Sequence, residues 1–248
     1  FTANIAAWGQ MEQAVQYGQE TYQALKHAPF PVIGAPSGMA LGGGCEILLH
    51  CSAVQAHAET YMGLVEVGVG VLPAWGGCKE MLQRWVMNPK RPGGLLPPVI
   101  KVFETISTAT VAKSAQEARD YLFLRPQDGI TMNRDRLLAD AKAKALAMVA
   151  GYKPPQPQEI SLPGPTAKVA MQMAVHDFHL QGKATAHDTV VANELATVLS
   201  GGDTDMTQTL TEADLSALER RHFMRLVRTP GTLARIETML NTGKPLRN

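Results

Sequence analysis

Two glutamates and a glycine-rich turn are the residues of this sequence whose types and spacing best suit catalysis. Three consecutive glycines, Gly42–Gly44, precede a short apolar stretch compatible with a helix, and Glu46 lies in its first turn. The free N–H groups at a helix start point outward and glycine lets a ligand come close, so this turn can hold an oxyanion or a phosphate. Glu66 follows twenty positions after Glu46, inside the apolar run LVEVGVGVL. A carboxylate buried in such a run acquires a raised pKa, which suits an acid or base near neutral pH.

Each of these residues also has an ordinary structural interpretation. The glycines can serve close packing of a helix on a strand, Glu46 can stabilise the positive end of the helix dipole, and Glu66 can face water. A phosphate loop would need Gly-Lys-Ser/Thr, but Gly44 is followed by cysteine and glutamate. A nucleophile elbow would need glycine two positions before Ser37, where alanine stands. The pair of glutamates favours chemistry, because two carboxylates at one site can supply both an acid and a base.

The histidines and cysteines carry weaker signals. His176 and His179 lie one helical turn apart, but no third ligand is spaced to complete a zinc site, so a solvated or packing pair is favoured. Cys45 and Cys51 flank His50 and could suggest a thiol nucleophile, yet their apolar setting favours a place in the core.

Composition excludes several classes of protein. The chain has 248 residues, enough for one large domain or a domain with an appendage, and a formal net charge of +1, which gives no reason to expect nucleic acid or an anionic membrane. Three cysteines without C-x-x-C spacing indicate reduced thiols rather than a secreted disulfide framework. No apolar run is long enough for a transmembrane helix. We therefore expect a cytoplasmic protein.

The glycine turn is expected to be positioned by a strand and a helix. An apolar run at residues 31–35 predicts a strand before the turn, and residues 53–57 predict a second one. A four-proline loop is expected at residues 88–98, and everything after about residue 113 is predicted to be helical. This pattern divides the chain into a mixed α/β part, residues 1–112, and a helical part, residues 113–248, with linkers near 153–165 and 200–210. The expected helices span about 11–26, 45–51, 77–86, 114–122, 133–150, 167–180, 187–199, 211–228 and 230–242.

Two motifs resemble the signature of the crotonase superfamily, the enoyl-CoA hydratases and isomerases. They are P-V-I-G-A-P-S-G-M-A-L-G-G-G-C-E at residues 31–46 and L-V-E-V-G-V-G-V-L-P-A-W-G-G at residues 64–77. The resemblance implies that the N–H of Gly43 binds the thioester oxygen of the substrate. It also implies that Glu46 and Glu66 hold the water that is added. The match departs at Trp75, where a small residue is usual, and at residues 50–52, where Cys-Asp is usual.

The resemblance also implies a substrate and a fold. The substrate is an acyl-CoA, whose acyl chain is expected to lie near Met39, Leu41 and Trp75, and no metal or redox cofactor is required. Lys90 and Arg91 could meet the phosphates of coenzyme A, although a solvated loop is the favoured interpretation. The expected fold is an α/β, crotonase-like (ClpP/crotonase) core followed by an extended helical C-terminal region.

Later motifs resemble the hydratase part of bacterial multifunctional fatty-acid oxidation proteins. They are S-A-Q-E-A at residues 114–118, T-E-A-D-L-S-A-L-E-R at 211–220 and R-T-P-G-T-L-A-R-I-E at 228–237. The resemblance implies a bacterial enzyme of fatty-acid β-oxidation that forms trimers or hexamers and is fused to, or associated with, a 3-hydroxyacyl-CoA dehydrogenase. No dinucleotide fingerprint occurs in this sequence. An enoyl-CoA isomerase and a catalytically silent assembly module remain open as alternatives.

The start of the sequence carries a further expectation. Crotonases supply a second oxyanion donor from an F-S-x-G-A-D type segment, to which Phe1–Asn4 has only a faint likeness that lacks the glycine. Phe1 is not a natural start, so we expect a processed or truncated chain whose second donor and first core strands lie upstream. The 248 residues alone are then expected to be nearly inactive.

Overall fold

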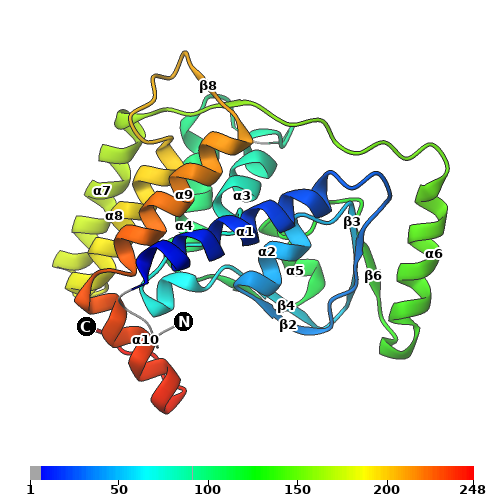
Figure 1. Cartoon of the computed structure of the whole chain (residues 1–248), viewed down its shortest axis with the longest axis horizontal. Coiled ribbons are helices and arrows are strands. Elements are labelled where there is room, and N and C mark those ends of the chain that lie inside the picture. The colour runs from blue at the N-terminus through cyan, green and yellow to red at the C-terminus, as the bar shows by residue number, and fades with distance from the viewer. Residues whose placement is uncertain (1–6, 91) are drawn as a thin grey trace.

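A computed structural model describes residues 7–90 and 92–248 of the chain. The expectations for Phe1–Asn4 and for Arg91 fall outside these ranges. Two small sheets lie beside the long helix α1 (Trp8–Lys26), and four C-terminal helices gather on the opposite side (Figure 1). Within residues 7–90 and 92–248, no helix is both long and apolar enough to cross a membrane.

The first sheet joins segments that are distant in the sequence. Its order is β1 (Ile33–Gly34), β3 (Ala53–His57) and β6 (Gly129–Thr131), and both pairings are parallel. The strands expected at residues 31–35 and 53–57 are thus present. The C-terminal region is predominantly helical as predicted, but β6 is an exception because it completes a sheet of the core.

The second sheet leads directly into the glycine turn. Its order is β2 (Gly38–Leu41), β4 (Thr60–Gly63) and β5 (Val111–Ala112), with β2 parallel to β4 and β5 antiparallel. The sequence did not indicate β2, because Gly38 reads as a breaker there. Gly38 has a positive φ of 75°, which glycine adopts without strain, and the strand starts on it.

The prolines of the predicted 88–98 loop lie partly inside a helix. α4 (Leu96–Ser107) starts in that stretch, with prolines in its first turn, where the missing N–H has no intrahelical acceptor to lose. α4 buries Val99, Val102 and Ile106 in the core, so a periodic apolar face outweighs the proline signal. The remaining elements of this part are α2 (Gly43–Leu49), the 3₁₀ helix η2 (Glu66–Val69), α3 (Gly77–Val86) and α5 (Ala115–Asp120).

Three of the four C-terminal helices begin at side-chain caps. Thr185 and Thr211 each accept a hydrogen bond from the N–H three residues later and form capping boxes with Asp188 and Asp214. Apolar residues of the first three of these helices join the main core, so these three are partnered within the chain. The helices are α7 (Pro165–Leu180), α8 (Ala186–Ser200), α9 (Glu212–Leu226) and α10 (Pro230–Thr242).

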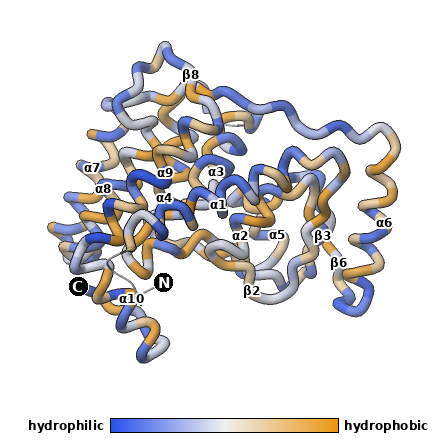
Figure 2. Tube along the Cα trace, viewed as in Figure 1, coloured by the Kyte–Doolittle hydropathy of each residue, from blue (hydrophilic) through white to orange (hydrophobic). Residues whose placement is uncertain are grey.

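One helix stands apart from the others. α6 (Leu137–Val149), after the 3₁₀ helix η3 (Arg134–Arg136), lies at the far edge beside β3 and β1, and a long, mostly hydrophilic segment connects it to α7 (Figures 1 and 2). The two stretches expected to be linkers meet each other, because β7 (Ile160–Ser161) pairs antiparallel with β8 (Thr209–Leu210).

Candidate active site

The glycine turn joins β2 to α2. Gly42 has φ 56° and ψ −126°, which only glycine adopts without strain, and its N–H donates to the carbonyl of Gly63 on the neighbouring strand. The helical geometry of α2 leaves the N–H groups of Gly43 and Gly44 without intrahelical acceptors. The ring of Trp75 lies 3.3 Å from the place where a Cβ on Gly43 would sit, so the aromatic ring covers one side of the turn.

Glu46 is buried behind the turn and held by a loop. Its Oε1 accepts hydrogen bonds of 2.9 Å from the N–H groups of both Trp75 and Gly77, at the start of α3. Only 3% of its surface is exposed. Burial raises the pKa of Glu46 to about 7, although the two N–H donors favour its ionised form and offset part of that rise. Glu46 can therefore change protonation near neutral pH.

Glu66 opens η2 on the other side of the turn. Both oxygens of its carboxylate are buried and have no hydrogen-bond partner among the described residues. Its Oε1 lies 3.2 Å from the place where a Cβ on Gly42 would sit. Burial, followed by the nearby charge of Glu46, raises the pKa of Glu66 well above its ordinary value. A buried carboxylate without a partner is costly in a folded protein and indicates a group waiting for a ligand.

Sequence reasoning missed a third buried carboxylate. Glu219 of α9 has no exposed surface, and it accepts hydrogen bonds from the N–H of Gly76 (2.9 Å) and the N–H of Lys79 (2.7 Å). Burial and the charge of Glu46 raise the pKa of Glu219 to about 8. A signal was present, because Glu219 falls four residues after Leu215 and therefore on the buried face of a predicted helix.

The C-terminal helices also hold η2, which carries Glu66. The hydroxyl of Thr232 on α10 donates to the carbonyl of Gly70 at 2.6 Å, and His187 of α8 contacts the same hydroxyl at 2.9 Å. The guanidinium of Arg235 donates to the carbonyl of Val67 at 3.3 Å. α8 and α10 therefore fix the main chain that presents Glu66.

Replacing Thr232 with valine should destabilise the fold by roughly 1–3 kcal/mol, because the buried carbonyl of Gly70 would lose its donor. Thr242→Val is the matched control, since the exposed hydroxyl of Thr242 donates to a carbonyl of its own helix and accepts from the exposed N–H of Lys244, so water can replace both bonds. Urea unfolding of the two variants measures the difference. Equal free energies of unfolding for T232V and T242V would show that this contact does not hold η2.

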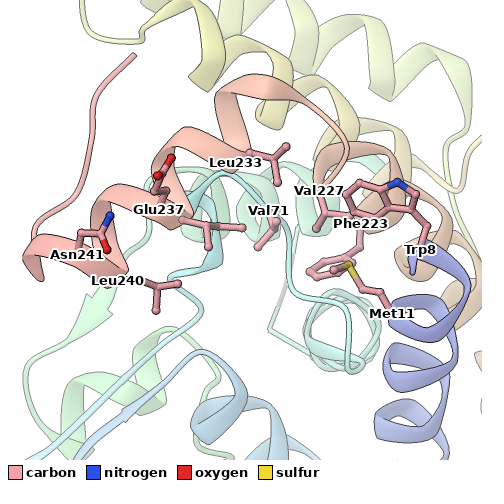
Figure 3. Close-up of a pocket in the computed structure, with 10 residues that line it drawn as sticks. Trp8, Met11, Val71, Phe223, Val227, Leu233, Glu237, Leu240 and Asn241 are labelled. Carbon is pink, nitrogen blue, oxygen red and sulfur yellow. The ribbon is translucent and has the colours of Figure 1, made fainter. Parts of the chain in front are cut away.

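The three residues expected to line the acyl pocket differ in their surroundings. Met39 is 81% exposed on β2 and Leu41 is half-buried, whereas Trp75 packs against Gly43. A separate apolar cavity of about 520 Å³ lies between the start of α1, the loop after η2, and helices α9 and α10 (Figure 3). Its lining residues include Trp8, Met11, Val71, Phe223, Leu233 and Leu240.

The weaker candidates have structural surroundings. Cys45 and Cys51 are buried, and burial raises the pKa of both thiols, which disfavours the thiolate that a nucleophile needs. Burial lowers the pKa of His50 to about 4, so this ring is neutral near pH 7. His179 uses its Nδ1 on the carbonyl of Ala184 at 2.9 Å. Lys90 is exposed in its loop.

Comparison with known proteins places these residues in a family. Residues 5–89 match the family model described as enoyl-CoA hydratase/isomerase. A Bacillus subtilis protein named "Probable 3-hydroxyacyl-CoA dehydrogenase" is 39% identical over 93% of this chain, which spans 29% of that relative's length. A short-chain-enoyl-CoA hydratase of Clostridium acetobutylicum is 39% identical over 26% of the chain and 24% of its own length.

Solved structures share the fold. An enoyl-CoA hydratase from Bacillus halodurans superimposes with a TM-score of 0.57 at 15% identity, covering 95% of this chain and 71% of the other. At this identity the structural similarity shows a shared fold only. The similarity of the site is carried by the sequence match over residues 5–89. Through residues 5–89, which carry the glycine turn and both glutamates, the chain matches the enoyl-CoA hydratase/isomerase family, and as a whole it shares the fold of a solved enoyl-CoA hydratase.

Proposed function

We propose that the site hydrates a trans-2-enoyl-CoA to a 3-hydroxyacyl-CoA in fatty-acid β-oxidation. The observation that carries this proposal is the pair of buried carboxylates, Glu46 and Glu66, on either side of the Gly42–Gly44 turn. Burial raises the pKa of each carboxyl above its ordinary value, which suits groups that give or take a proton in catalysis. Coenzyme A enters as part of the substrate, and the proposed reaction uses no resident cofactor.

The two carboxylates differ in a way that suggests separate roles. Glu46 accepts two N–H bonds, which favour its ionised form, so it suits the base that takes a proton from water. Burial, followed by the charge of Glu46, raises the pKa of Glu66 well above its ordinary value, so Glu66 suits the acid that gives a proton to the α-carbon. The hydroxide of the water bonds to the β-carbon and the double bond is consumed. The N–H of Gly43 stabilises the negative thioester oxygen that develops in the transition state.

An enoyl-CoA isomerase on the same fold is the nearest alternative. Moving a double bond needs one group that removes and returns a proton, whereas hydration uses two groups around one water. The presence of both Glu46 and Glu66 in the site favours hydration. A silent assembly module would gain nothing from two buried carboxylates with raised pKa values, because burying each of them costs stability.

The assay separates these alternatives. With crotonyl-CoA, a hydratase lowers the absorbance of the conjugated enoyl thioester, because hydration removes the double bond. With a 3-enoyl-CoA, only an isomerase raises that absorbance, because it moves the double bond into conjugation. We expect loss with the first substrate and no gain with the second. The measurement uses this chain and a version extended upstream by about a hundred residues, a typical domain length. Gain without loss would identify an isomerase, and neither signal in the extended version would identify an assembly module.

The product suggests a partner. A 3-hydroxyacyl-CoA is the substrate of a 3-hydroxyacyl-CoA dehydrogenase, the activity named for the Bacillus subtilis relative. We infer that the two activities are fused or associated, and that the hydratase part assembles as a homo-oligomer, a trimer or hexamer.

A further inference from the structure

Two carboxylates share the start of α3 in an alternating pattern. Glu46 takes the N–H groups of Trp75 and Gly77, and Glu219 takes those of Gly76 and Lys79. Glu46 comes from α2 and Glu219 from α9, so this five-residue stretch is held from two sides. Because neighbouring N–H groups in one loop point to different carboxylates, the loop cannot turn toward one without moving the other.

We propose that Glu219 is a positioning residue for the hydration: it fixes the loop at residues 75–79 so that the N–H groups of Trp75 and Gly77 hold Glu46 in place. The effect of Glu219 on catalysis rests on the proposed function. The structural coupling between Glu219 and Glu46 through residues 75–79 does not. Glu219 touches the loop and not the glycine turn, so it acts through Glu46.

A purely structural cap would not need this residue. The N–H groups at a helix start are commonly satisfied by a serine, threonine or aspartate of the same segment, whereas here the acceptor comes from 143 positions further along the chain. Burying a third carboxylate beside Glu46 and Glu66 is costly. The ammonium of Lys79 does not offset that cost through a contact, because it bonds Glu80 at 2.6 Å and Gln23 at 2.9 Å.

The surroundings of Glu219 are crowded with titratable groups. The titratable groups that face Glu219 come from α2, η2 and α3, namely Glu46, Glu66, Cys78 and Lys79. Gly76 reinforces the constraint, since its φ is 97° and an added Cβ would lie 2.7 Å from the ring of His50. The positive φ of Gly76 and its contact with His50 therefore restrict the main chain at residues 75–79 to this conformation.

Hydrogen exchange tests the coupling without any assay of activity. In Glu219→Leu, the amides of Gly76 and Lys79 lose their acceptor and must exchange faster in either case. The proposal requires that the amides of Trp75 and Gly77 also exchange faster, by about tenfold or more, although their acceptor Glu46 is unchanged. Glu219→Gln, which keeps one acceptor oxygen, should show a smaller effect of the same kind and serves if the leucine variant does not fold.

The matched control is Glu194→Gln. Glu194 on α8 pairs with His222, which lies one turn after Glu219 on α9. Glu194 makes no hydrogen bond to residues 75–79 in the described structure. It should leave the four amides unchanged. If only Gly76 and Lys79 respond in the Glu219 variants, or if E194Q affects all four amides equally, the proposal is overturned.

The kinetic consequence separates positioning from stability. In the hydratase assay, Glu219→Gln should lower kcat by about tenfold to a hundredfold, the usual cost of a small misplacement, with KM changed by less than about threefold. Unchanged kcat in a folded variant would overturn the positioning role. If the extended version with no substitution has no hydratase activity, the proposed function fails, while the exchange result still decides whether Glu219 holds the loop that binds Glu46.

Discussion

Replacing Glu66 with glutamine is expected to lower hydration turnover by about a hundredfold to ten-thousandfold, the range for losing a general acid or base. The same change should raise the melting temperature at pH 8. The carboxylate of Glu66 is buried with no hydrogen-bond partner, so its charge is a cost that the folded state bears. Glutamine keeps the shape of the side chain and removes that charge.

The sign of the pH dependence follows from the raised pKa of Glu66. The folded protein keeps the proton at pH values where the unfolded chain, with a pKa near 4.5, has lost it. Rising pH above 4.5 therefore favours unfolding. The stabilisation by Glu66→Gln should be largest at pH 8 and should shrink toward zero near pH 4.5, which thermal unfolding at a series of pH values measures.

Glu46→Gln is the companion variant. The amide oxygen can still accept from Trp75 and Gly77, so the loop should stay in place while turnover falls by a similar factor. An exposed glutamate such as Glu20 provides the control, because its replacement removes charge without touching the site. Near-unmodified turnover in either E46Q or E66Q would disprove the two-carboxylate mechanism. A lower melting temperature for E66Q at pH 8 would show that the buried carboxylate of Glu66 does not destabilise the folded protein.

The parts of the site that sequence reasoning could predict are local ones. Gly43 and Glu46 belong to one turn and one helix, so their juxtaposition follows from helical geometry over a few residues. Glu66 could be singled out because a charge stood within an apolar run. That Glu66 faces the glycine turn depends on β2 pairing with β4, which the breaker at Gly38 concealed.

The missed parts are long-range. Glu219 reaches Gly76 across 143 positions, and β6 reaches β3 across 74, since Gln55 pairs with Gly129. A two- or three-residue strand has no periodicity to detect, and a single glutamate on a helical face does not reveal what that face meets. The prolines at the start of α4 predicted a loop where a helix begins. Proline in the first turn of a helix is favourable, so proline alone does not distinguish a loop from a helix start.

Replacing Lys79 with methionine is expected to cost roughly 3–5 kcal/mol of folding free energy, the typical penalty for removing one partner of a buried ion pair. The ammonium of Lys79 has only 1% exposure and lies 2.6 Å from Glu80 and 3.5 Å from Glu212. Lys26 pairs with the same two carboxylates, at 2.7 Å and 2.9 Å. Two cations and two anions balance in the folded protein, and methionine would leave one buried negative charge uncompensated.

A second substitution shows whether charge or packing is responsible. In Lys79→Met with Glu80→Gln, one cation and one anion remain, so the double variant should be more stable than Lys79→Met alone. Lys101→Met is the surface control, because Lys101 pairs with Glu104 at 3.6 Å on the exposed surface, and its replacement should cost at most about 1 kcal/mol.

Burial would raise the pKa of Glu80, but Lys79, His50 and Lys26 hold it far below its ordinary value. That stability is present above pH 4.5 and lost as pH falls, so the cost of K79M measured by urea unfolding should shrink in acid. A double variant no more stable than K79M would assign the cost to packing of the lysine stem instead.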